Sequence, residues 1–240
     1  MRLKEVYKSS PFGVVSSFLI GISHSAVFSL IAVYATSMNF SILEVSIVTF
    51  LFAISGAISQ WPIGKLSDVL DRRIVIIYTT FGAALFCFLA IISSGQMYMP
   101  AGLATSKIFF YICIMCFSFC SLPMFALIFA HTNDFIPKEK FVAAGAGLQF
   151  VFGLGAICGP FMCSLFMEFL GENGFFIFLI IFHSFIGLFG IYRMQIRESG
   201  DNPDSQFAPM PQTITPAGIE LNPSTEPIDE PNNLNEFKKI

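Results

Sequence analysis

Six long apolar stretches, separated by short polar segments, make up most of this chain. Each stretch holds about 20 residues or more, which is the length that an α-helix needs to cross the hydrocarbon core of a bilayer. The stretches predict helices over residues 12–37, 43–64, 74–93, 104–130, 141–170 and 175–194. We therefore expect an all-α membrane protein with one six-helix transmembrane domain over residues 12–196.

The two ends of the chain lack this pattern. Residues 1–11 form a short basic segment, which we expect on the cytoplasmic side. From Glu198 onward proline, asparagine, serine, threonine and acidic residues predominate, and such a segment buries too little apolar surface to offset its ordering entropy. We therefore predict a disordered cytoplasmic tail over residues 197–240. Such a tail can bind a partner, but a tail that is only solvated is the simpler interpretation.

The composition is that of a membrane-embedded chain. Of the 240 residues, 55% are hydrophobic, 12% are charged and 30 are phenylalanine, which lies far outside the usage of soluble domains. The formal net charge of −3 reflects acidic residues that gather after residue 197. The composition gives no support to nucleic-acid binding, and we expect membrane lipid around the helices.

The placement of lysine and arginine predicts the orientation in the membrane. Of the 13 basic residues, 12 lie in the two ends of the chain or in the segments after the second and fourth apolar stretches. The other three segments contribute only Lys107. Because cytoplasmic segments are enriched in basic residues, the distribution fits six spans of a plasma (inner) membrane with both termini cytoplasmic.

The most specific motif lies between the second and third apolar stretches and reads Gly64-Lys65-Leu66-Ser67-Asp68-Val69-Leu70-Asp71-Arg72-Arg73. We expect a loop in water here, because Trp61 is typical of a membrane interface and Pro62 is tolerated at a helix end. Gly64 permits close approach of two helices, and Asp68 lies where a carboxylate can cap the next helix. A loop that only fixes the topology is the simpler alternative.

A second motif lies in the fifth apolar stretch, which is rich in glycine around residues 145–159. Gly155 and Gly159 are one helical turn apart and form a G-x-x-x-G face, which permits direct contact with a neighbouring helix. Pro160 removes one backbone hydrogen bond and can kink the helix. Glycine-rich helices are common in membranes, so this motif is informative mainly in combination with the first.

Together the two motifs resemble those of the major facilitator superfamily. In outline, the signature between the second and third helices of each half of that fold is G-[KR]-L-S-D-R-x-[GD]-R-R, and Val69 here replaces a basic residue. The matching positions are Gly64, Lys65, Leu66, Ser67, Asp68, Asp71, Arg72 and Arg73. With Ser10–Val15, Gln60–Gly64 and Pro209–Pro211, the chain resembles the C-terminal six-helix half of the YcaD-type branch.

The resemblance implies a secondary active transporter of a small solute, built as one half of a twelve-helix alternating-access protein. In the family the aspartate and arginines of the first motif gate the cytoplasmic side, so Asp68 would need a partner outside its own half. Gly155, Gly159 and Pro160 would then serve helix packing and conformational change. The partner would be a missing N-terminal half or a second six-helix chain. A non-transporting scaffold or binding bundle is the alternative.

Two residues are candidates for the substrate cavity. His24 lies near the middle of the first apolar stretch, where an ionisable group is costly unless it faces a cavity or a polar partner. Two alternatives stay open for His24: it faces a cavity, or it is hydrogen-bonded inside the bundle. Gln149, in the glycine-rich stretch, is the weaker candidate. We interpret His183 as a structural or lipid-adjacent residue.

The sequence holds no pattern of an enzyme or a metal site. The H-E-x-x-H pattern, a G-x-S-G nucleophile and a phosphate-binding glycine loop are all absent from it. Cys113 and Cys116 form a lone C-x-x-C inside an apolar stretch, where buried thiols acting as small apolar side chains are the default. We therefore expect no catalytic residues, no metal and no cofactor, and a small molecule as substrate.

Overall fold

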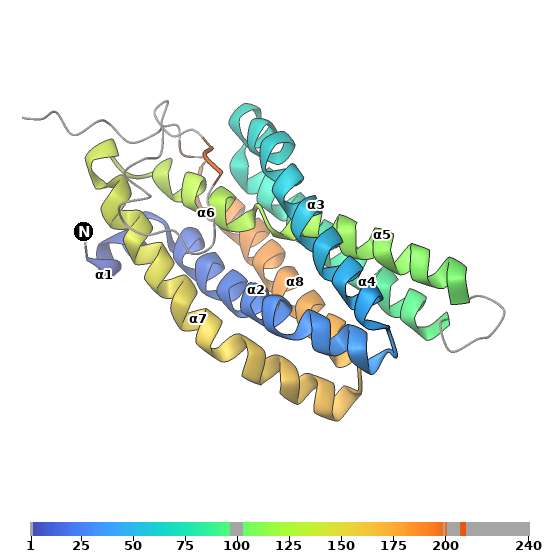
Figure 1. Cartoon of the computed structure of the whole chain (residues 1–240). Helices are drawn as coiled ribbons and strands as arrows, with labels where there is room; N and C mark the ends of the chain where they lie inside the picture. Colours follow the sequence, from blue (N-terminus) through green and yellow to red (C-terminus); the bar gives the residue numbers. More distant parts are fainter. Residues whose placement is uncertain (1, 97–102, 199, 201–206, 210–240) are drawn as a thin grey trace, which may run out of the picture.

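The computed structural model describes residues 2–96, 103–198, 200 and 207–209, and these residues form a bundle of helices without strands (Figure 1). The elements are α1 (Leu3–Ser9), α2 (Pro11–Ser37), α3 (Ile42–Val69), α4 (Arg72–Gln96), α5 (Leu103–Ser121), α6 (Met124–Asn133), the 3-10 turn η2 (Lys138–Lys140), α7 (Phe141–Leu170) and α8 (Gly174–Ile196). Within the described part of the chain, six spans are long and apolar enough to cross a membrane, with α5 and α6 together forming one. The predicted all-α membrane fold with six spans is confirmed.

Local side-chain chemistry explains where two of the long helices begin. The Ser10 hydroxyl accepts the N–H of Gly13 at 3.2 Å, and Pro11 occupies the first helical position, where its missing N–H costs nothing. At the start of α3, the Ser41 hydroxyl accepts the N–H of Glu44, and the Glu44 carboxylate accepts the N–H of Ser41 at 2.8 Å. This reciprocal capping box satisfies backbone donors that the first turn leaves free.

The helices pack as two groups that α8 joins. Helix α2 packs mainly on α7, α5 packs on both α4 and α3, and α8 packs on α4 and on α2 (Figure 1). In each group a serine hydroxyl crosses a helix pair to a backbone carbonyl: Ser17 of α2 donates to Leu148 of α7 at 2.8 Å, and Ser55 of α3 donates to Met115 of α5 at 2.6 Å. Because lipid offers no hydrogen-bond partner, these bonds hold polar side chains inside the bundle and fix the register of each pair.

Glycines bring the backbones of α2 and α7 into direct contact. A Cβ atom at Gly155 would overlap the carbonyl oxygen of Phe18, and one at Gly159 would overlap that of Ile22. In return, a Cβ at Gly21 would overlap the carbonyl of Phe152 on α7. The interface therefore excludes any side chain at these positions.

Basic side chains from distant parts of the sequence lie at one end of the bundle, which we call the basic end. Arg73 donates to the carbonyl of Arg197, and the Arg197 guanidinium donates to the carbonyl of Ser9, so the start of α4, the residue after α8 and the end of α1 meet there. Lys107 lies at the opposite end, where its Nζ pairs with Glu44 at 2.6 Å. Arg73 and Arg197 thus lie at one end of the described bundle and Lys107 at the other.

The structure differs from the prediction at the end of the second span. Trp61 and Pro62 do not end the helix, because α3 continues to Val69 and the turn consists of Leu70 and Asp71. Proline costs one hydrogen bond here, but the following residues stay helical, and the Ser67 hydroxyl bonds back to the carbonyl of Gly64 at 2.8 Å. The first six residues of the motif, 64–69, therefore belong to α3 and are positioned by the helix.

The fourth span differs in another way. The predicted single helix over residues 104–130 is two helices, because α5 ends at Ser121 and α6 begins at Met124. Pro123 lies between them, has no N–H to donate and clashes with the preceding turn, which explains the break. The second helix then continues to Asn133, beyond the expected end.

The tail over residues 197–240, predicted to be disordered, lies mostly outside the described residues. Residues 207–209 are described, and there the chain lies against the bundle. Ala208 is 8% exposed, and the side chain of Phe207 packs against buried residues of the bundle. This contact was not expected from the polar composition of the tail.

The glycine interface predicts a matched pair of substitutions on α7. Gly155→Ala inserts a methyl group where the α2 backbone lies, and overpacking of this kind costs about 1–3 kcal/mol. Gly153→Ala makes the same change where nothing lies within 4 Å of a Cβ, and should be neutral or slightly stabilising. Thermal unfolding of the purified variants in one detergent measures both, and equal melting temperatures would contradict the direct contact.

Candidate functional site

Arg72 is the centre of a buried charged cluster at the basic end. Arg72 is 7% exposed, and its Nη2 donates to Asp68 Oδ1 at 2.8 Å. Its Nη1 donates to the carbonyl of Ala130 at 3.2 Å and to the carboxylate of Asp134. One guanidinium therefore joins the last turn of α3 to the end of α6. We call Asp68, Arg72 and Asp134 the Arg72 cluster.

The two carboxylates of the Arg72 cluster differ in their access to solvent. The Asp134 side chain is 10% exposed, whereas the Asp68 side chain is 37% exposed. Charge-assisted bonds of this kind are strongest where water is excluded, so the Arg72–Asp134 contact is the fixed part of the cluster. Asp68 can exchange one of its contacts without leaving a buried charge unpaired.

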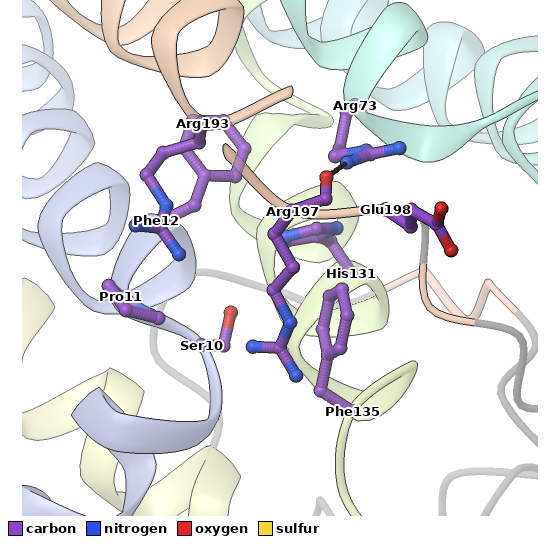
Figure 2. Close-up of a pocket in the computed structure, with 9 residues that line it drawn as sticks. All are labelled: Ser10, Pro11, Phe12, Arg73, His131, Phe135, Arg193, Arg197 and Glu198. Carbon is purple, nitrogen blue, oxygen red and sulfur yellow. Dashed lines mark hydrogen bonds between the residues drawn. The ribbon is translucent and has the colours of Figure 1, made fainter. Parts of the chain in front are cut away.

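Arg73 belongs to a second set of contacts at the same end. Its guanidinium makes two parallel bonds to Asp71, from Nε to Oδ1 at 3.1 Å and from Nη2 to Oδ2 at 2.6 Å. Its Nη1 donates to the carbonyl of Arg197 at 2.6 Å, drawn as a dashed line in Figure 2. Arg73 thus holds the α3–α4 turn against the end of α8.

A small pocket opens beside Arg73 (Figure 2). The guanidinium of Arg197 lies over the ring of Phe135, with Cζ 4.0 Å from the ring centroid, as in a cation–π contact. The pocket is lined by side chains from α2, α4, α6 and the end of α8: Ser10, Pro11, Phe12, Arg73, His131, Phe135, Arg193, Arg197 and Glu198. It shows that four segments converge at the basic end.

The remaining residues of the first motif take separate positions. Lys65 is exposed, and its Nζ lies 4.1 Å from the centroid of the Trp61 ring. Gly64 is buried beneath the ring of Phe207. Asp68 accepts the backbone N–H of Phe207 at 2.9 Å, so both of these contacts of Asp68, with Arg72 and with Phe207, are made within this chain. The sequence prediction had assigned Asp68 a partner outside its half, and had missed Asp134 and Phe207.

A second polar cluster lies inside the bundle, at the break between α5 and α6. His24 of α2 is 2% exposed, and its Nε2 lies 3.1 Å from both the carbonyl and the hydroxyl oxygen of Ser121. The same hydroxyl lies 2.8 Å from Nε2 of His183 on α8. We call these three residues the His–Ser–His cluster.

The hydrogen-bond partners fix the direction of these bonds. His183 Nδ1 lies 2.9 Å from the carbonyl of Leu179, which can only accept, so Nδ1 carries the proton and Nε2 is an acceptor. The Ser121 hydroxyl therefore donates to His183 and accepts from the Nε2–H of His24. A directed chain of hydrogen bonds links α2, the helix break and α8.

The two candidate cavity residues take different positions. His24 faces Ser121 and the ring of Phe152, and its 2% exposure favours the interpretation of a histidine hydrogen-bonded inside the bundle. Gln149 is half-buried on α7, next to Leu148, whose carbonyl accepts the Ser17 hydroxyl. His183, interpreted from the sequence as structural or lipid-adjacent, is buried and lies in the same cluster as His24.

The motif cluster at the end of the second span, the break in the fourth and the glycine contact of the fifth occur together in one bundle. The sequence model of the Major Facilitator Superfamily matches residues 13–227. The chain belongs to the Major Facilitator Superfamily. This confirms the resemblance at the level of the superfamily, and confirms the expectation of a non-enzymatic transporter family.

Superfamily relatives among curated proteins are distant. An uncharacterized MFS-type transporter, YE1530 of Yersinia enterocolitica, is 23% identical over 201 residues, which cover 84% of this chain and 47% of that protein. The uncharacterized MFS-type transporter YfkF of Bacillus subtilis is 27% identical over 186 residues, or 74% of this chain and 44% of that protein. The chain spans about half the length of the curated relatives it matches. No solved structure matches it.

The Arg72 cluster predicts unequal effects of two substitutions in this superfamily chain. Arg72→Gln leaves the carboxylate of Asp134 buried without its cation, and breaking a buried pair in this way costs about 3–5 kcal/mol. Lys65→Gln, in the same motif but exposed, should change the free energy of unfolding by no more than about 0.5 kcal/mol. Thermal unfolding compares the two, and a stable Arg72→Gln variant would contradict the structural role of Arg72.

The His–Ser–His cluster gives an independent prediction. Ser121→Ala removes the only donor to His183 Nε2 that the directed chain contains, and an unsatisfied buried group costs about 1–3 kcal/mol. Ser164→Ala is the control, because that exposed hydroxyl bonds only to a carbonyl of its own helix, that of Phe161. If Ser121→Ala melted at the same temperature as Ser164→Ala, the hydrogen bonds of the His–Ser–His cluster would contribute nothing to the stability of the fold.

Proposed function

We propose that this bundle is one six-helix half of a secondary active transporter that moves a small solute by alternating access. The observation that supports it most directly is the superfamily match over residues 13–227 by a bundle of six spans, about half the length of its relatives. Transporters of this kind bind their solute between two halves near the middle of the membrane. We infer that the chain corresponds to the C-terminal half of the YcaD-type branch, on the motifs of α3 and α7.

The orientation we propose follows from the basic end. Arg72, Arg73, Arg193 and Arg197 all lie there, and basic residues accumulate on the cytoplasmic side of a membrane. The basic end then faces the cytoplasm of a plasma (inner) membrane, with both termini on that side. Large apolar side chains on the outer faces of the helices, such as Phe150 and Phe161, then contact lipid or the second unit.

In this proposal the first motif is the cytoplasmic gate, formed by Gly64, Lys65, Asp68, Arg72 and Arg73. The solvent exposure of the two carboxylates suggests different roles. Arg72 stays paired with the buried Asp134, whereas Asp68 is accessible enough to accept a donor from a second six-helix unit. Closing of the gate then consists of forming that contact, and opening consists of breaking it. Such a difference in contacts between the open and the closed state is sufficient to shift the population between these two states.

Helix α7 supplies the moving contact in this proposal. Gly155 and Gly159 place no side chain of α7 against the α2 backbone, so we propose that this segment of α7 moves relative to α2, away from the Ser17–Leu148 bond, and Pro160 lies beside it. Gln149 is the residue of α7 that we propose for the substrate cavity. His24 contributes through the His–Ser–His cluster, by linking α2 to the break between α5 and α6.

The proposal is tested by solute exchange in cells that express the protein as its gene encodes it. We expect Asp68→Asn to lower the exchange rate about tenfold or more, because a hydrogen bond to a charged group is worth about 1.5–3 kcal/mol. Glu139→Gln removes one exposed carboxylate between α6 and α7 and should leave the rate unchanged. The probes are labelled sugars, amino acids, organic acids and organic cations.

Two results would contradict the proposal. Equal exchange by wild type and Asp68→Asn would remove the gate role of Asp68. Exchange of no probe class above that of cells lacking the protein, with the protein present at normal levels in the membrane, would favour the non-transporting scaffold.

A further inference from the structure

Residues 207–209 make a specific contact with the first motif. The backbone N–H of Phe207 donates to Asp68 Oδ1 at 2.9 Å. The ring of Phe207 covers Gly64 so closely that a Cβ there would overlap it. The exposed carboxylate and the bare backbone of one helical turn of α3 are thus both occupied by the tail.

The contact extends beyond α3. The ring of Phe207 packs against two clusters of buried side chains, one that includes Val14 and Phe129 and another that includes Ile63 and Met124. Both clusters draw members from α2, α6 and α7, so Phe207 contacts a surface to which several helices contribute. Burial of an aromatic side chain in such a position is worth more than a backbone hydrogen bond alone.

The composition of the tail makes Phe207 unusual. Phe207 and Phe237 are the only aromatic residues after residue 197, in a segment dominated by proline and acidic or amide side chains. Phe207 is followed by Ala208 and Pro209, and Pro209 has no N–H to leave unsatisfied in an extended segment. A short extended peptide with one aromatic anchor is the kind of ligand that a shallow helical surface can hold.

We propose that Phe207, Ala208 and Pro209 form an inhibitory plug, which occupies the Gly64–Asp68 surface that the second six-helix unit must contact when the gate closes. This inference rests on the proposed function, because it needs the gate contact of Asp68. With the tail docked, the Phe207 ring covers Gly64 and Asp68 Oδ1 already accepts both Arg72 and the N–H of Phe207, so a helix of the second unit has no room against the same surface. The tail and the second unit therefore compete, and release of the tail speeds the transport cycle.

Substitutions at Phe207 test this competition. Phe207→Ala removes the anchor, and Phe207→Asp places a second carboxylate beside Asp68, so both should release the tail. We expect each variant to raise the rate of exchange of the probe that wild type moves fastest, by up to about tenfold. Tyr7→Ala is the control, because it truncates a half-exposed aromatic residue of α1 at the same end.

Hydrogen–deuterium exchange of the full chain measures the contact without a solute. Release of the plug should increase deuterium uptake of residues 64–69 in both Phe207 variants, and Tyr7→Ala should match wild type. Unchanged uptake in both Phe207 variants would overturn the docked state. Increased uptake with a transport rate equal to or below that of wild type would overturn the inhibitory role alone. Absence of exchange of any probe by every variant would overturn the proposed function, and this inference with it.

Discussion

The bridge that Arg72 makes between α3 and α6 is the interaction on which the basic end depends. Two carboxylates from different parts of the chain share one buried guanidinium, and the buried carboxylate of Asp134 would be destabilised without it. The bridge fixes the last turn of α3, and that turn presents Gly64 and Asp68 on one surface. The contacts of Asp71, Arg73 and Arg197 then hold the following turn and the end of α8 in place. A charged surface with one replaceable contact is therefore built on a rigid support.

Inside the bundle, the polar contacts solve a different problem. Backbone and hydroxyl groups in lipid have no water to bond, so serines donate to carbonyls across helix pairs, and His24 and His183 share the hydroxyl of Ser121. Around Gly155 and Gly159 the α2–α7 contact is made by closely packed backbone, whereas the Ser17–Leu148 hydrogen bond crosses the same interface at another point. Helix pairs are thus held by hydrogen bonds at a few points and by backbone packing at others. The hydrogen-bonded points are fixed, and the glycine contact is where we propose movement.

The sequence was sufficient for the parts of the fold that depend on local pattern. The number of spans follows from the length of the apolar stretches, and the superfamily follows from the motif between the second and third spans. The break at Pro123 had a signal that could have been used, because a proline inside a predicted helix either kinks it or ends it. The extension of α3 past Pro62 had no such signal, since the same residue type was tolerated there.

The contacts of the candidate site were beyond local pattern. His24 and Ser121 are 97 positions apart, and Asp68 and Phe207 are 139 positions apart, so only the packed bundle brings them together. Asp134 follows an apolar span and precedes two lysines, and nothing in this local sequence indicates burial. Its burial depends on Arg72 coming from a different helix.

The central claim is that the exposed end of α3 meets a second six-helix unit. Val69, 84% exposed on the last turn of α3, is the position from which to test it. A photoreactive amino acid at Val69, activated in intact cells and followed by mass spectrometry of the cross-linked peptides, identifies what lies there. We expect a cross-linked peptide from a second membrane unit, either outside residues 1–240 or in another copy of this chain. Cross-links confined to lipid or to the same copy of the chain would contradict it.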